Sequence, residues 1–182
     1  MAIIKGNTTQ SPNAATTSHV INKPSLAIVN DVCIIGASFN GNPGTLTWPT
    51  GFTPFGPNTG QTNPKIYTAY KKLDGSEGAS FTITSTNSVA SGLACRVYTG
   101  VDTTTAMDAT PVISDGAAAT TASVTGITTV TNGAMLVVFI GIMYAITIQH
   151  NKLHIHKRIF EKGVRLAAVA AIGMALTNVV FG

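Results

Sequence analysis

Hydrophobic and polar residues alternate in short runs along most of the chain. The segments KIYTAYKKL at 65–73 and ASFTITSTN at 79–87 alternate with a period of two, and residues 32–39 form a continuous apolar run rich in branched side chains. Gly, Pro, Asn and Asp separate such runs about every 8–12 residues. This rhythm predicts about seven or eight short strands within 20–148, and therefore an all-β fold, an antiparallel β-sandwich or jelly roll.

The same pattern divides the chain into three parts. Residues 1–18 are polar and irregular, which predicts an extended N-terminal arm. Residues 19–148 carry the strand pattern and predict the β-sandwich domain. Residues 149–182 combine a basic linker with an apolar C-terminal segment, which we expect to complete the sandwich or to mediate assembly.

The divergent C-terminal part is compatible with three structures. In the first, which is favoured, 133–148, 152–160 and 164–181 are strands that complete the sandwich. In the second, 166–181 is a helix that docks on the domain or on a neighbour, because LAAVAAIGMAL is rich in Ala. The third is a membrane hairpin of 133–148 and 166–181, and it is disfavoured because each run falls short of the roughly 20 residues that span a bilayer.

Composition and charge narrow the function classes. The chain is 45% hydrophobic and only 10% charged, against about 25% charged residues in an ordinary domain. Residues 1–148 hold six basic and six acidic residues, so the net charge of +4 arises in 149–165. Nucleic-acid binding needs a broad basic face, so no nucleic-acid partner is expected. The start of the chain lacks an apolar h-region, so no secretion signal is expected.

A basic, histidine-rich stretch follows residue 148. No Asp or Cys lies beside its histidines, and the neighbouring Lys and Arg side chains would repel a cation. A solvated basic surface is therefore favoured over a metal site, and no metal or cofactor is expected. We expect this surface to be an assembly interface, made of Lys152, His154, His156, Lys157 and Arg158.

The remaining candidate chemistry has a structural interpretation at each position. The carboxylates of 1–148 stand near Gly, Thr or Asn, where acidic side chains cap turns, so no catalytic residue is assigned and no enzyme is predicted. His19 is expected at the surface. For the aromatic residues, core packing is favoured over a sugar-stacking contact surface. That alternative surface would contain Trp48, Phe52, Phe55, Tyr67 and Tyr70.

The two cysteines lie in apolar, strand-like runs. Cys33 belongs to DVCII and Cys95 to LACRV. Two buried thiols that pack as small hydrophobic side chains are favoured over a disulfide. A bridge would require the two strands to be neighbours, and the sequence leaves this open.

Several segments in order carry a family resemblance over about residues 22–141. These segments are NDVCII at 30–35, TWPTGF at 47–52, YTAYKK at 67–72 with FTIT at 81–84, VYTGVD at 97–102, and the apolar strand at 134–140. Together they resemble a β-sandwich domain of bacteriophage virion and tail-associated structural proteins. The chain departs from the family after about residue 142, where a further Pro-Gly turn and Thr-rich strands would be expected.

The resemblance implies a non-enzymatic virion structural protein, such as a head decoration, a fibre or a tail-tip component. Its expected partners are copies of itself and other virion proteins, and it would be made in the host cytoplasm and exposed on the particle. The alternative is a glycan-binding, host-attachment module that uses the aromatic loop, with a cell-surface glycan as its partner. No membrane partner is expected.

Overall fold

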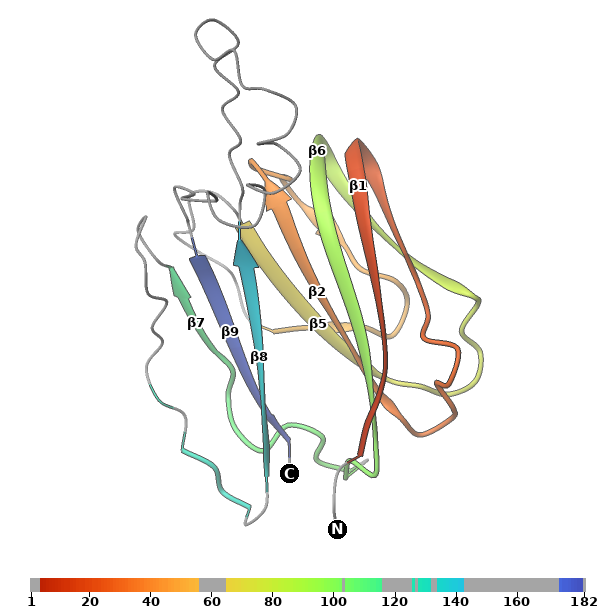
Figure 1. Ribbon diagram of the computed structural model, residues 1–182, viewed down its shortest axis with the longest axis vertical. Helices are drawn as coiled ribbons and strands as arrows, with labels where there is room; N and C mark the ends of the chain where they lie inside the picture. The colour runs from red at the N-terminus through yellow and green to blue at the C-terminus, as the bar shows by residue number, and fades with distance from the viewer. Residues whose placement is uncertain are drawn as a thin grey trace, which may run out of the picture.

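The structure is a computed structural model that describes residues 4–55, 65–102, 104–115, 126, 128–131, 134–142 and 174–181. Within these residues every regular element is a β-strand, which confirms the predicted all-β class. The strands form two antiparallel sheets, a larger one of six strands and a smaller one of three (Figure 1).

The larger sheet is built from the first six strands of the chain. These are β1 (Ile4–Asn22), β2 (Val32–Asn40), β3 (Leu46–Thr47), β4 (Thr53–Pro54), β5 (Lys65–Lys72) and β6 (Ser80–Thr99). Their order is β1-β6-β2-β5-β4, and β3 pairs with another part of β6. The smaller sheet has the order β7-β9-β8 and contains β7 (Val112–Asp115), β8 (Met135–Ile142) and β9 (Met174–Phe181).

The strand β2 lies at the centre of the larger sheet, between β6 and β5. Its residues from Val32 to Ala37 are all buried. A strand that is covered on both faces needs apolar or small side chains at successive positions, and this accounts for the continuous apolar run in the sequence. By contrast, β6 alternates exposed and buried residues from Ser80 to Ser85, because one face of this part meets solvent.

The long strands β1 and β6 turn over together at one end of the molecule (Figure 1). The Thr9 hydroxyl donates to the Asn22 carbonyl at 2.5 Å, although a straight strand would separate these residues by roughly 40 Å. The β1–β6 register shifts between Asn13 and Thr16 and again between Thr16 and Ser18. Such irregularities bend a strand pair without ending it.

The expected N-terminal arm, residues 1–18, is extended from Ile4 onward. It pairs with β6 along the edge of the larger sheet. The boundary placed at residue 18 therefore falls inside a strand, and β1 continues to Asn22. Its polar composition gave no apolar period, because an edge strand buries few of its side chains.

The first core cluster lies where the turned-over parts of β1 and β6 pack against β2. Ile21, Phe81 and Ile83 come from the turned-over parts, and they meet the face of β2 that carries Ile35 and Phe39. The same cluster takes further buried side chains from β5 and from the second part of β6, namely Ala69, Leu93, Cys95 and Val97.

His19 lies inside this turn-over and holds its two parts together. The expectation that His19 lies at the surface is therefore wrong. It is 0% exposed. Its Nδ1 lies 2.8 Å from the Ser91 hydroxyl and its Nε2 lies 2.9 Å from the Ser85 hydroxyl. The ring also meets the Phe39 ring edge-on, with centroids 5.0 Å apart. One imidazole thus bonds to both parts of β6 and packs on β2.

The second core cluster joins the two sheets. It contains Val32 and Ile34 from β2, Tyr98 from β6 and Val137 from β8, with Phe55 and Val101 from the adjoining loops. These side chains project from the face of β2 and β6 opposite to the first cluster. The smaller sheet is therefore held against the larger one by apolar contact.

The C-terminal segment is a strand where it is described. Residues 174–181 form β9, which pairs with β7 on one side and β8 on the other, so a helix over these residues is wrong. The predicted strand at 133–148 corresponds to β8, and the predicted strand at 152–160 lies outside the described residues. None of the described segments forms a helix of the length and apolarity that crossing a bilayer requires.

We expect the stability of the fold to depend on the protonation of His19. Burial lowers the pKa of His19 below 6.5, so the unfolded chain takes up a proton more readily than the folded one. The free energy of unfolding should be level above pH 6.5 and fall as the pH drops from 6.5 through the lowered pKa. His19→Gln should unfold about 1–3 kcal/mol more easily at pH 7.5, and it should lose this slope. Urea unfolding between pH 7.5 and 5 measures both, and equal slopes in the two proteins would contradict the assignment.

Candidate functional site

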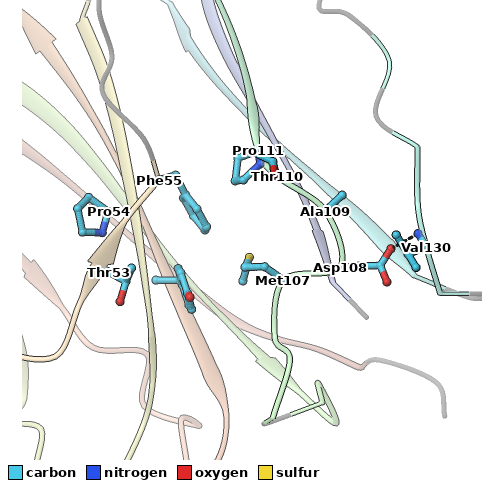
Figure 2. A pocket seen from close by; sticks show the side chains of 10 residues that line it. Thr53, Pro54, Phe55, Met107, Asp108, Ala109, Thr110, Pro111 and Val130 are labelled. Atoms are coloured by element: carbon cyan, nitrogen blue, oxygen red, sulfur yellow. Dashed lines mark hydrogen bonds between the residues drawn. The ribbon is translucent and has the colours of Figure 1, made fainter.

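An open depression lies at one side of the larger sheet, where β4, β5 and the loop at 104–111 meet. Its volume is about 680 Å³. Figure 2 shows the aromatic side of this pocket facing Met107, with Asp108 and Val130 at the other side. The lining residues are Thr53, Pro54, Phe55, Tyr70, Met107, Asp108, Ala109, Thr110, Pro111 and Val130.

Two stacked aromatic rings form the wall on the β4–β5 side. The Phe55 and Tyr70 rings are stacked, with centroids 5.0 Å apart and an interplanar angle of 16°. The backbone places them, because the Phe55 N–H donates to the Thr68 carbonyl at 2.9 Å. Phe55 is buried in the second core cluster, whereas Tyr70 is half-buried. Tyr70 therefore offers the more accessible aromatic surface.

Asp108 holds the opposite wall in place. Its two carboxylate oxygens accept the backbone N–H of Val130 at 2.6 Å and that of Thr131 at 2.8 Å. Hydrogen bonds from Thr131 and Val130 lower the pKa of Asp108. Among the described residues that line the pocket, Asp108 is the one carboxylate.

The five aromatic residues of the predicted contact surface fall into separate groups. Phe55 and Tyr70 line the pocket. Trp48 stacks on Phe52 at 6.5 Å, and both pack on the first core cluster. Tyr67 meets Phe39 edge-on at 5.7 Å on that same side. The structure thus brings two of the five together at the pocket and assigns the other three to packing.

The predicted basic assembly interface cannot be placed. Lys152, His154, His156, Lys157 and Arg158 lie outside the described residues. Among the residues that are described, no group of three His, Cys, Asp or Glu side chains is arranged to hold a metal ion.

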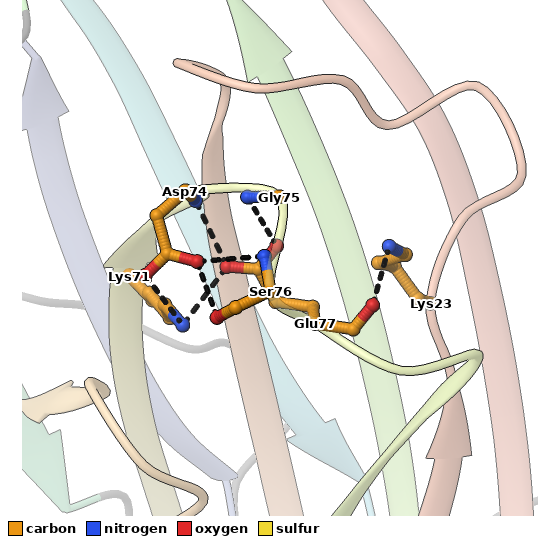
Figure 3. Close-up of polar contacts among 6 residues, drawn as sticks. All are labelled: Lys23, Lys71, Asp74, Gly75, Ser76 and Glu77. Carbon is orange, nitrogen blue, oxygen red and sulfur yellow. Dashed lines mark hydrogen bonds and ion pairs between the residues drawn. The ribbon is translucent and has the colours of Figure 1, made fainter.

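A polar corner at the β5–β6 turn contains the most buried ion pair of the described residues (Figure 3). Lys71 Nζ lies 2.9 Å from Glu77 Oε1 and 3.3 Å from Asp74 Oδ2. Glu77 also accepts the backbone N–H groups of Asp74 and Gly75, each at 3.0 Å. Lys23 Nζ donates to the Glu77 carbonyl at 3.2 Å. The ions satisfy one another and the turn backbone, so this corner is structural.

The predicted role of carboxylates as turn caps is confirmed at several positions. Asp31 Oδ2 accepts the Ile28 N–H at 2.9 Å. Asp74 Oδ1 accepts the Ser76 N–H at 2.8 Å, and Asp102 Oδ1 accepts the Thr104 N–H at 2.7 Å. Hydrogen bonds from Ser76 lower the pKa of Asp74 to about 2. These side chains fix loops at the ends of strands.

Sequence reasoning missed the far wall of the pocket. Met107 and Asp108 belong to the segment DTTTAMDATP, which has the composition of a plain loop. Val130 lies more than twenty residues further along the chain, and the hydrogen bonds of the Val130 and Thr131 N–H groups to Asp108 hold it at this place.

Comparisons of the chain with protein-family models, with curated proteins and with solved structures found no match. The interpretation of the pocket and of the surfaces therefore depends on their own geometry.

Replacing Glu77 by Gln should destabilise the fold by about 2 kcal/mol, because a charged, hydrogen-bonded group would be lost beside Lys71. The Glu77 side chain is 3% exposed, whereas that of Asp74 is 59% exposed. Asp74→Asn is the matched control, because it removes the charge of the other carboxylate that pairs with Lys71. Asp74 is exposed to solvent, so the loss of stability should be smaller. Urea unfolding at pH 7 measures both. A larger loss from Asp74→Asn would mean that burial does not determine the strength of this network.

Proposed function

We propose that the protein is a non-enzymatic structural protein of a bacteriophage particle that acts through contacts with copies of itself and with other virion proteins. The observation that carries this proposal is a well-anchored apolar loop on the surface, residues 24–30. Leu26 is 72% exposed, Ile28 is 63% exposed and Val29 is 52% exposed. Clustered apolar side chains on a soluble surface mark a place of contact.

Hydrogen bonds fix the conformation of the apolar loop. The Ala27 N–H donates to the Pro24 carbonyl at 3.1 Å. Asp31, which is buried, accepts the Ile28 N–H through its side chain at 2.9 Å and returns its own N–H to the Ile28 carbonyl at 3.2 Å. A loop held in this way loses little conformational entropy when a partner covers it, which favours binding.

The base of the apolar loop is tied to the β5–β6 turn. The Asn30 N–H donates to the Leu73 carbonyl at 2.9 Å, and the Leu73 N–H donates to the Asp31 carbonyl at 2.8 Å. Asn30 adopts a φ of 72°, a left-handed conformation that Asn tolerates better than most residues. The loop thus stands on the same end of the molecule as the ion-paired corner.

The β1 edge of the larger sheet is a weaker candidate for contact than the apolar loop, because part of its backbone is already hydrogen-bonded. Backbone groups of β1 are bonded by nearby side chains of the same strand. The Val20 N–H donates to Asn13 Oδ1 at 3.3 Å, the Ser18 N–H donates to Thr16 Oγ1 at 3.1 Å, and Thr9 covers the Asn22 carbonyl. An edge satisfied in this way is a poor template for a further strand.

The architecture that we propose is an antiparallel β-sandwich. The two core clusters support it, since one fills the turned-over larger sheet and the other lies between the two sheets. Placement on the particle, with synthesis in the host cytoplasm, belongs to the same proposal. So does the basic interface around Lys157 and Arg158, as a second contact of the subunit.

The second candidate function is binding of a cell-surface glycan at the pocket. Its support is the half-buried ring of Tyr70 on one wall of the pocket and the carboxylate of Asp108 on the opposite wall. Aromatic faces and carboxylates are the groups that hold the apolar faces and the hydroxyls of sugars.

Charge placed on the apolar loop should abolish self-association. We expect the purified chain to form oligomers, and the double variant Leu26→Asp/Ile28→Asp to be monomeric with an unchanged melting temperature, because both side chains are exposed. Light scattering after size exclusion measures the mass. Val130→Asp is the matched control, since Val130 is 85% exposed but lies elsewhere, and it should assemble normally. A double variant that assembles like the parent protein would remove the support from the loop.

The glycan candidate is tested by two tyrosines on opposite faces of β5. If the pocket binds polysaccharide, Tyr70→Ala should weaken retardation in an affinity gel by about 2- to 10-fold through the loss of stacking. Tyr67→Ala removes the same side chain from the other face and should leave binding unchanged once circular dichroism shows that it is folded. Equal binding by all three proteins, or none by the parent chain, counts against the glycan function.

A further inference from the structure

The two cysteines meet inside the first core cluster. Cys33 lies on β2 and Cys95 lies on β6, and both are 0% exposed. In the β2–β6 register Cys33 is opposite Val97, while Cys95 is opposite Ile35. The cysteines are therefore diagonal neighbours whose side chains project from the same face of the sheet. Their Sγ atoms are 3.2 Å apart.

The close approach of the two sulfurs is the observation that favours a disulfide. The backbone of β2 and β6 is paired continuously from Val32 to Asn40, so the two strands already hold the cysteines side by side. The sulfurs need to approach from 3.2 Å to a bond length of about 2.0 Å. Diagonal partners lie about 7–8 Å apart at Cα, so closing the bond takes rotation of the two side chains together with a small approach of the two strands.

The geometry points to Cys33 and Cys95 as a cross-linking site, at which a low-molecular-weight disulfide such as oxidised glutathione converts the two thiols to a cystine. One cysteine thiolate attacks the glutathione disulfide and releases one glutathione thiol. The second thiolate then attacks the mixed disulfide and releases the other. The two cysteines lose two protons and two electrons, and the glutathione disulfide is reduced to two thiols.

The burial of the pair determines when the bond can form and how long it lasts. The hydrogen bond to Cys95, burial and the charge of Cys95 all raise the pKa of the Cys33 thiol. The folded protein therefore holds little reactive thiolate, and exchange takes place while the chain folds or opens. Once the core closes, the same burial shields the cystine from reductants. The inference goes beyond the proposed function, and in a chain made in a reducing cytoplasm the exchange takes place when the folded chain opens in an oxidising medium.

The test is refolding of the full chain under two redox conditions. The reduced chain is unfolded in guanidinium chloride and diluted either into glutathione buffer or into excess reductant, and each product is then denatured and alkylated. In the glutathione buffer we expect a mass lower by two hydrogens, no alkylated cysteine, and a peptide that links Cys33 to Cys95. Because the bond closes a long loop, the melting temperature should rise by about 5–15 °C.

Cys33→Ala and Cys95→Ala are the controls, because neither can form the intramolecular bond and neither should show a melting shift between the two buffers. A parent chain that folds in glutathione buffer and still alkylates at both cysteines would overturn the inference. So would a chain that carries glutathione on either cysteine or forms disulfide-linked dimers. If refolding fails, chain purified in its folded state and incubated with oxidised glutathione at mild denaturant gives the same readout, with the same outcomes.

Discussion

The turn-over of β1 and β6 is the constraint on which the rest of the structure depends. The two strands leave the plane of the larger sheet together, and this lets them cover β2 with their own apolar side chains. His19 determines where this happens, because its ring bonds to Ser85 before the turn and to Ser91 after it. One neutral imidazole offers a donor and an acceptor to the two hydroxyls, and the Ser85 hydroxyl also donates to the Asn87 carbonyl at 2.8 Å. The first core cluster, including the cysteine pair, exists because this bend closes.

Two kinds of strand were predictable from the sequence. In one kind, buried and exposed residues alternate, and in the other, successive residues are all buried. The apolar run of β2 and the alternation of early β6 follow directly from the faces that these strands bury, whereas β5 is buried or half-buried on both faces from Lys65 to Lys71. Strand β1 was not predictable in this way, because TTQSPNAATTS has no apolar period and is held by pairing with β6. His19 was misplaced for a related reason. A lone polar residue in the sequence gives no sign of two serines that lie more than sixty residues away.

The candidate site was predictable only in part. Aromatic residues near 48–70 were expected to pack or to bind; the structure packs three of them on the first core cluster and places Phe55 and Tyr70 at the pocket. Tyr67 and Tyr70 are three residues apart on one strand, so they face opposite sides of the sheet. Both are half-buried, and Tyr70 lies at the pocket because its face of β5 is the one beside the loop at 104–111, whose composition carries no periodic signal. The proximity of Cys33 and Cys95 likewise required the β2–β6 register, since a shift by one residue would place them on opposite faces.

The chain has few charged residues, and its exposed backbone groups are protected in a way that does not need them. Many proteins block an edge strand with Lys or Glu, whose charge repels a second strand. Here the edge of β1 is satisfied by the side chains of Thr9, Asn13 and Thr16, which bond directly to backbone groups. Carboxylates act in the same way at the turns, where they accept backbone N–H groups. Short polar side chains thus protect backbone groups along β1 and at these turns. The apolar loop at 24–30 differs from these polar surfaces. A partner that excludes water from the loop gains free energy by burying apolar area, which the polar β1 edge cannot provide.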